Sequence, residues 1–184
     1  MLYITAGKTG SVKINSVIKD CLPRLLDKFN VIHQCGDHSK YNDYQELKDI
    51  YAGLGDTASG DYYVEKFIFD EEIGEVFEKA DILLSRSGAH TVEEIRTFKK
   101  PAVLIPIPWV SHNEQYENAQ ILVKEGLGVI LPEEELNCPN LVSSLIEAEK
   151  KLEGNAEFSP EYSEEPLNIM ISTINDLYET KAKN

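Results

Sequence analysis

The chain has 184 residues, with 18 basic and 32 acidic side chains and a formal net charge of −14. This excess of negative charge argues against nucleic acid and anionic lipid surfaces as direct partners, because both require a basic face. The hydrophobic fraction of 42% supports a folded core, and no apolar run reaches the roughly 18 residues of a membrane span.

The N-terminus begins directly with a strand-like run and lacks the basic and apolar regions of a signal peptide, which predicts a cytoplasmic location. The chain has three cysteines, Cys21, Cys35 and Cys138, an odd number without metal-site spacing. We therefore expect them to be free thiols of a reducing compartment.

Strand-like and helix-like segments alternate along the chain. Thr91, followed three residues later by Glu94, predicts a capping box at the start of one helix. Strands are predicted at 2–5, 30–34, 62–69, 81–85, 101–105 and 128–131, and helices at 12–26, 40–51, 71–79, 91–99, 115–125, 141–152 and 167–178. The acidic stretch 154–165 is expected to be a surface excursion.

Such alternation predicts an α/β fold, a Rossmann-like parallel sheet with helices on both faces. We expect one domain over residues 1–184, with a C-terminal helical extension at about 139–184. Ligands of such folds bind at the carboxyl ends of the strands, where the strand-to-helix loops gather. The loops to consider are therefore 6–11, 66–70, 86–91 and 106–115.

The first of these loops is rich in glycine and precedes a helix, which suits a phosphate. Its candidate ligand-binding residues are Gly7, Lys8, Thr9 and Gly10. A P-loop is excluded because Leu2 occupies the position of its first glycine. A dinucleotide fingerprint is excluded because Thr5 occupies the position of its first glycine. The alternative is a tight structural turn.

The loop after the predicted strand 81–85 contains small residues, which allow a ligand to approach the backbone at a helix N-terminus. Its candidates are Arg86, Ser87, Gly88, Ala89 and His90. Glu94 lies one turn into the following helix. Its carboxylate could accept hydrogen bonds from the two hydroxyls of a ribose, or serve only as the acid of the capping box.

The third loop is stiffened by two prolines and leads into a polar helix start with Glu114, Gln115 and Asn118. Amide side chains of this kind can bind sugar hydroxyls, although a solvated helix N-terminus would have the same composition. A lone histidine such as His112 in this loop is more often a surface residue than a catalytic one.

The sequence predicts no metal and no cofactor. It contains no Asp-x-Asp pair, and the four histidines lack the spacing of a metal site. It also contains no Gly-x-Ser-x-Gly nucleophile motif.

Three motifs carry a resemblance to a known family. They are R-S-G-A-x-T-x-x-E-I at 86–95, P-x-x-x-x-P at 101–106 and Q-Y-x-N-A at 115–119. In the residues of these motifs and in their order along the chain, residues 2–135 resemble the C-terminal, donor-binding half of the MurG family. Members of that family transfer N-acetylglucosamine to lipid I in peptidoglycan synthesis. The resemblance implies one half of a two-Rossmann-domain GT-B glycosyltransferase that inverts the anomeric centre without a metal.

The resemblance also implies roles for individual residues. Glu94 matches the acid that holds the uridine ribose, and 87–90 the loop that faces the phosphates and the sugar. Gln115 and Asn118 match the sugar-binding helix start, and the backbone of Phe67 and Ile68 the segment that binds uracil. Two positions depart from the family: residues 6–10 read Ala-Gly-Lys-Thr-Gly instead of Gly-Gly-Ser-Gln-Gly, and Glu114 replaces the first glutamine of a pair.

The family's N-terminal domain, which binds the lipid acceptor, contacts the membrane and supplies the base, has no counterpart in these 184 residues. We therefore expect a UDP-GlcNAc-binding domain that needs an acceptor-binding domain in cis or in trans and is inactive alone, with its catalytic residues unassigned. A two-chain precedent is the eukaryotic dolichol-linked transferase. The alternatives are the donor half of another nucleotide-sugar glycosyltransferase with a separate acceptor subunit, and a non-catalytic nucleotide-sugar-binding module.

Overall fold

The computed structural model describes residues 1–109 and 113–154. Its strands are β1 (Leu2–Thr5), β2 (Val31–Gln34), β3 (Tyr62–Glu65), β4 (Ile82–Ser85), β5 (Ala102–Leu104) and β6 (Gly128–Ile130). Its α-helices are α1 (Val12–Leu26), α2 (Asp43–Leu54), α3 (Asp70–Lys79), α4 (Ala89–Phe98), α5 (Glu114–Lys124) and α6 (Cys138–Gly154). Two short 3₁₀ helices follow α2 and β6, at Gly55–Thr57 and Glu133–Glu135.

The strands form one parallel sheet in the order β3-β2-β1-β4-β5-β6. This is the Rossmann order, and the sequence-based prediction of the fold class is confirmed. The direction in which strands are added reverses at β1, which lies between β2 and β4. In the register, Thr5 is paired with Gln34 on one side and Ser85 on the other, so these three strand ends lie together.

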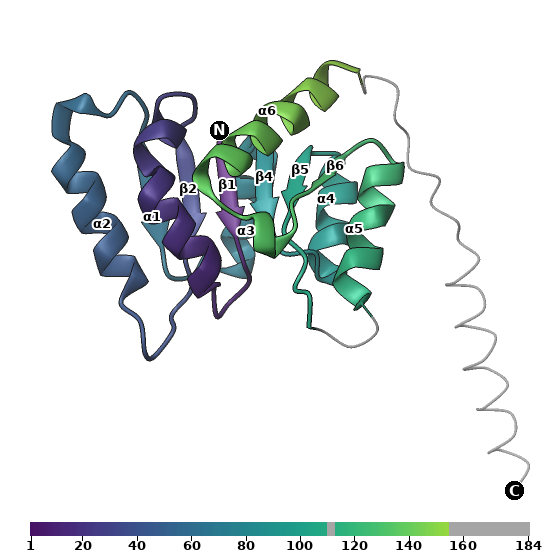
Figure 1. Ribbon diagram of the computed structural model, residues 1–184, viewed down its shortest axis with the longest axis horizontal. Coiled ribbons are helices and arrows are strands. Elements are labelled where there is room, and N and C mark those ends of the chain that lie inside the picture. Colours follow the sequence, from purple (N-terminus) through teal and green to yellow (C-terminus); the bar gives the residue numbers. More distant parts are fainter. Residues whose placement is uncertain (110–112, 155–184) are drawn as a thin grey trace, which may run out of the picture.

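Helices lie on both sides of the sheet (Figure 1), and alternate residues of a central strand point to opposite sides. Leu2 and Ile4 belong to a core shared with α1, α2 and α6, whereas Tyr3 belongs to a second core shared with α3, α4 and α5. Helices therefore cover both faces of the sheet, as predicted. Among the described residues, no helix combines the length and the apolar character needed to cross a membrane.

Two element boundaries differ from the predictions in ways that matter for the site. β3 ends at Glu65 rather than Phe69, because the amide of Ile68 donates to the Gln34 side chain instead of continuing the sheet. α4 begins at Ala89, with Gly88 as its N-cap and no side-chain cap, so the predicted Thr91–Glu94 capping box is wrong. The Gly88 carbonyl already accepts from the Val92 amide, which starts the helix earlier. The predicted helix 167–178 and nearly all of the acidic stretch lie outside the described residues.

The cysteine prediction is wrong for two of the three residues. Cys21 in α1 and Cys138 at the start of α6 form a disulfide across a separation of 117 residues. The spacing in the sequence could not show this, because the pairing depends on α6 packing back along α1. Cys35 is free and buried, and burial raises the pKa of its thiol to about 11.

A buried polar network lies between α1, β2, α2 and β3. The ring nitrogens of His33 contact the Tyr62 hydroxyl at 2.7 Å and the Asn15 amide oxygen at 3.2 Å. Asn15 donates from its side-chain nitrogen to the Asp43 carboxylate at 2.8 Å and to the Cys35 carbonyl at 2.9 Å. Burial lowers the pKa of His33 to about 3, so the imidazole is neutral in the folded protein at ordinary pH.

This histidine makes stability depend on pH. Unfolding restores a pKa near 6.5, so the unfolded chain takes up a proton below that pH while the folded chain does not. Stability contributed by neutral His33 is therefore full above pH 6.5 and is lost as pH falls from about 6.5 towards 3. We expect His33→Gln to flatten the slope of the unfolding free energy in this window by up to about 1.4 kcal/mol per pH unit. Urea unfolding at pH 4.5 to 7.5 measures the two slopes, and parallel curves would contradict the assignment.

Candidate functional site

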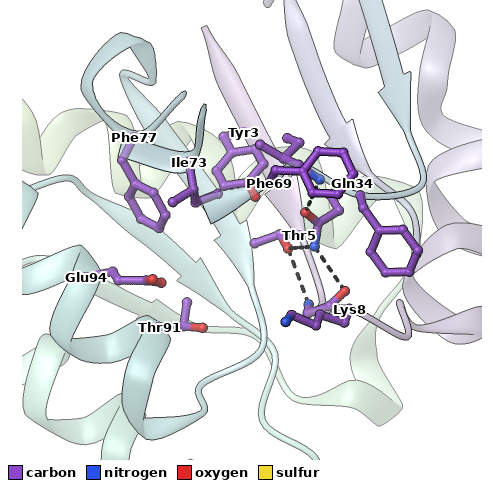
Figure 2. Close-up of a pocket in the computed structure, with 12 residues that line it drawn as sticks. Tyr3, Thr5, Lys8, Gln34, Phe69, Ile73, Phe77, Thr91 and Glu94 are labelled. Atoms are coloured by element: carbon purple, nitrogen blue, oxygen red, sulfur yellow. Dashed lines mark hydrogen bonds between the residues drawn. The ribbon is translucent and has the colours of Figure 1, made fainter. Parts of the chain in front are cut away.

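A cavity of about 300 Å³ lies at the carboxyl ends of β1 and β2, beside α3 and α4 (Figure 2). The cavity therefore lies at the carboxyl edge of the sheet and next to β1, where the order of the strands reverses. Ligands of open α/β folds bind at this place. Its lining residues are Tyr3, Thr5, Gly7, Lys8, Gln34, Phe67, Ile68, Phe69, Ile73, Phe77, Thr91 and Glu94.

The polar part of the cavity has opposite charges on separate elements. Figure 2 shows Glu94 and Thr91 on α4, across the space from Thr5 and Lys8 on the β1 side. Burial raises the pKa of Tyr3 to about 12, and the negative charge of Glu94 acts in the same direction, so the phenol stays neutral. The cavity can therefore offer a carboxylate to a diol and an ammonium group to an anion.

The other part of the cavity is apolar. Phe67 and Phe69 lie on the loop after β3 and are 39% and 68% exposed, which is unusual for large aromatic side chains. Ile73 and Phe77 of α3 continue this wall, and Phe77 is held by edge-on contact with Tyr3 and by stacking on Phe98. A planar ring could pack against such a surface.

Five of the residues predicted from the sequence line the cavity: Gly7, Lys8, Phe67, Ile68 and Glu94. The other predicted residues are not part of its lining. They are Thr9, Gly10, Arg86, Ser87, Gly88, Ala89, His90, Glu114, Gln115 and Asn118.

Gly10 has a structural role in the first loop. Its φ is +70°, and a Cβ there would lie 1.9 Å from the carbonyl oxygen of Cys35. The turn after β1 thus packs directly against the turn after β2. Gly7 also has a positive φ, of +78°, but no atom would lie within 4 Å of an added Cβ. The structural-turn alternative therefore fits Gly10, whereas Gly7 lines the cavity.

Arg86 connects its own loop, after β4, to three other loops instead of lining the cavity. Its guanidinium group donates to the Ile105 carbonyl at 3.0 Å and to the Ser11 hydroxyl at 2.8 Å. It also pairs with the Glu133 carboxylate, and both side chains are only 11% exposed. Ser11 is the N-cap of α1, so this arginine ties the loops after β1, β4, β5 and β6 together.

The loop after β4 is joined to the start of α5. The Ser87 hydroxyl donates to the Gln115 carbonyl at 2.7 Å, and the Asn118 amide donates to the Ser87 carbonyl at 3.2 Å. The Gln115 side chain accepts from the Ile107 amide at 3.0 Å. Glu114, Ala89 and His90 are exposed at the starts of α5 and α4. His112 lies outside the described residues.

Seven lining residues were not predicted from the sequence: Tyr3, Thr5, Gln34, Phe69, Ile73, Phe77 and Thr91. Tyr3, Thr5 and Gln34 belong to strands that appear simply buried in the sequence pattern. The available signal was that Thr5 and Gln34 are polar residues at strand ends, which places them at the ligand-binding edge. Within 1–109 and 113–154, no group of three or more His, Cys, Asp and Glu is arranged to hold a metal ion.

Comparison with known proteins identifies the family. The model of the glycosyltransferase family 28 C-terminal domain matches residues 1–174. Two curated relatives are named UDP-N-acetylglucosamine–N-acetylmuramyl-(pentapeptide) pyrophosphoryl-undecaprenol N-acetylglucosamine transferase. The relative from Lawsonia intracellularis is 36% identical over 146 residues, 79% of this chain, and the one from Desulfotalea psychrophila 35% over 149 residues, also 79%. The chain spans 38% of the length of each.

A solved structure gives the same result. The crystal structure of MurG from Acinetobacter baumannii superposes with a TM-score of 0.66 at 25% identity, covering 84% of this chain and 45% of that one. The resemblance stated from the three motifs is therefore confirmed. The sheet is of the kind found in the C-terminal halves of GT-B glycosyltransferases, and the chain belongs to the glycosyltransferase family 28 C-terminal domain family, with MurG-like relatives.

Proposed function

We propose that this domain binds UDP-GlcNAc and presents it for transfer to a lipid-linked acceptor. The observation that carries the proposal is the cavity at the carboxyl ends of β1 and β2, in which Glu94 faces Lys8 beside an exposed aromatic wall. A carboxylate, a cation and a flat apolar surface are the groups that a nucleoside diphosphate needs for its ribose, its phosphates and its base.

In this proposal the uracil lies against the segment Phe67 to Phe69, and the two ribose hydroxyls donate to Glu94. The diphosphate lies between Lys8 and the start of α4, where the first amides of the helix have no partner within the helix. The GlcNAc group extends towards the start of α5, where Glu114, Gln115 and Asn118 are located. His90 and Ser87–Ala89 border that path.

The reaction proposed is a single displacement with inversion. An acceptor hydroxyl attacks C1 of the sugar, the bond from C1 to the diphosphate oxygen breaks, and the proton of the hydroxyl passes to a base. The charge that develops on the departing UDP is stabilised by Lys8 and by the dipole of α4, so no metal is required. The base belongs to an acceptor-binding domain, supplied in cis or in trans, which also makes the membrane contact. The names of the relatives give an N-acetylmuramyl-(pentapeptide) pyrophosphoryl-undecaprenol as their acceptor. We extend the proposal to this chain, with lipid I as acceptor and peptidoglycan synthesis at the inner face of the cell membrane as the setting.

A different donor sugar is the second candidate, and Glu114 is the observation that favours it. A carboxylate accepts hydrogen bonds from sugar hydroxyls but cannot donate one to the acetamido carbonyl of GlcNAc, as an amide can. Calorimetric titration with several UDP-sugars separates the two candidates. The proposal predicts the highest affinity for UDP-GlcNAc, and equal or higher affinity for another UDP-sugar would favour the second candidate.

The 184-residue chain is expected to bind the donor without transferring its sugar. Orienting both reactants in near-attack geometry supplies about 7–11 kcal/mol of barrier reduction, and one domain orients only the donor. Incubating the chain with UDP-GlcNAc and lipid I, with and without a separately supplied acceptor domain, measures this. Robust transfer by the chain alone would contradict the proposal and would indicate a base within it, such as His112.

A further inference from the structure

Gln34 is a buried polar residue in the cavity wall that the proposed function does not use. It is the last residue of β2 and is 7% exposed. Its side-chain nitrogen donates to the Gly7 carbonyl at 3.1 Å and to the Thr5 hydroxyl at 3.3 Å. Its side-chain oxygen accepts from the Ile68 amide at 2.9 Å. Figure 2 shows these hydrogen bonds converging on one side chain.

These bonds join the loops that follow two strands on either side of Gln34. Gly7 follows β1 and Ile68 follows β3, and these strands are not neighbours, because β2 lies between them. The last residue of β2 lies between Thr5 and Glu65, its partners in the register, so its side chain can reach both loops. A carboxamide carries a donor and an acceptor on one rigid plane, so it can satisfy a carbonyl on one side and an amide on the other.

We propose that Gln34 is a positioning residue that fixes the loop after β1 and the segment after β3 in one relative geometry. The inference rests on the proposed function, in which the loop after β1 holds the diphosphate and the segment after β3 holds the base. Gln34 then contributes to affinity without touching the nucleotide, by keeping the two subsites at the separation that one nucleotide spans.

Two substitutions of similar size separate the two halves of this role. Gln34→Glu keeps an acceptor for the Ile68 amide but cannot donate to Thr5 or Gly7, so it releases only the first loop. Gln34→Met removes both connections. A titration with uridine reports on the base subsite alone, and a titration with UDP reports on both subsites. Gln45→Glu, on the exposed face of α2, is the matched control for an added negative charge.

For Gln34→Glu we expect uridine affinity within about threefold of the parent chain and UDP affinity lower by about tenfold or more, the loss corresponding to the two donated bonds. For Gln34→Met both affinities should fall. The UDP loss in Gln34→Glu should persist at 0.5 M NaCl, where direct repulsion between the new carboxylate and the diphosphate is screened. Gln45→Glu should bind both ligands like the parent.

The outcomes distinguish this inference from the function on which it rests. A parent chain that binds neither uridine nor UDP would overturn the proposed function itself. A parent that binds both, with Gln34 variants of unchanged affinity, would overturn the positioning role alone. Equal losses of uridine and UDP affinity in Gln34→Glu, matched to a lower Tm, would also overturn it, because Gln34 would then support only the general stability of the fold.

Discussion

Replacing Glu94 by glutamine is expected to weaken UDP binding about tenfold or more and to change the Tm little. In the proposed complex the carboxylate accepts hydrogen bonds from both ribose hydroxyls, and hydrogen bonds to a charged group contribute about 1.5–3 kcal/mol each. The neutral amide has the same shape but presents only one oxygen acceptor. Because α4 begins at Ala89 with Gly88 as its N-cap, Glu94 does not cap the helix, and its substitution removes no capping interaction.

The adjacent glutamate provides the matched control. Glu93 lies on the same helix, is 57% exposed and pairs with Arg96 rather than lining the cavity. Glu93→Gln should therefore bind UDP like the parent chain, with a loss of at most about 1 kcal/mol of stability from the exposed ion pair. Calorimetry and thermal melting of both variants test the assignment. Unchanged affinity together with a lower Tm in Glu94→Gln would assign Glu94 a structural role.

Reduction of the Cys21–Cys138 disulfide is expected to lower the free energy of unfolding by about 2–5 kcal/mol. The bond closes a loop of 117 residues, and a long loop loses the most conformational entropy in the unfolded chain. It also ties α6 to α1, and α6 contributes Leu141, Leu145 and Ala148 to the core on that face of the sheet. Urea unfolding with and without a thiol reductant measures the difference.

Cys138→Ala controls for side effects of the reductant. This variant should unfold like the reduced parent, and reductant should not change it further. Thiol titration in denaturant without reductant should find one reactive group per parent chain, which is Cys35. Three reactive thiols, with a stability that does not respond to reductant, would contradict the pairing.

Periodicity predicted the strands and their layers because the physical causes are local. In β1 and β4 the hydrophobic residues alternate between two cores, which a sheet covered on both faces requires. The boundaries that were missed depend on tertiary contacts. β3 is shorter than its β-prone run because the Gln34 side chain takes the Ile68 amide. α4 starts before its apparent cap because the small residues at 87–89 allow the helical turn to begin at Gly88.

The candidate site was predictable where the loops themselves carry the chemistry. Gly7, Lys8, Phe67 and Ile68 come from βα loops and Glu94 from the helix that follows such a loop, and all five line the cavity. Arg86 belongs to the same motif as Glu94, at 86–95, but it does not line the cavity. Its buried pairing with Glu133 connects residues 47 positions apart, which no local pattern reveals. The disulfide between α1 and α6 was missed for the same reason.

If the domain binds its donor as proposed, UDP-GlcNAc should bind to the 184-residue chain without a divalent metal. The measurement is a calorimetric titration in EDTA, repeated after addition of Mn²⁺. We expect a saturable one-to-one binding curve in EDTA that Mn²⁺ does not tighten, because Lys8 and the start of α4 supply the positive charge for the diphosphate. No binding in EDTA, with binding restored by Mn²⁺, would contradict it.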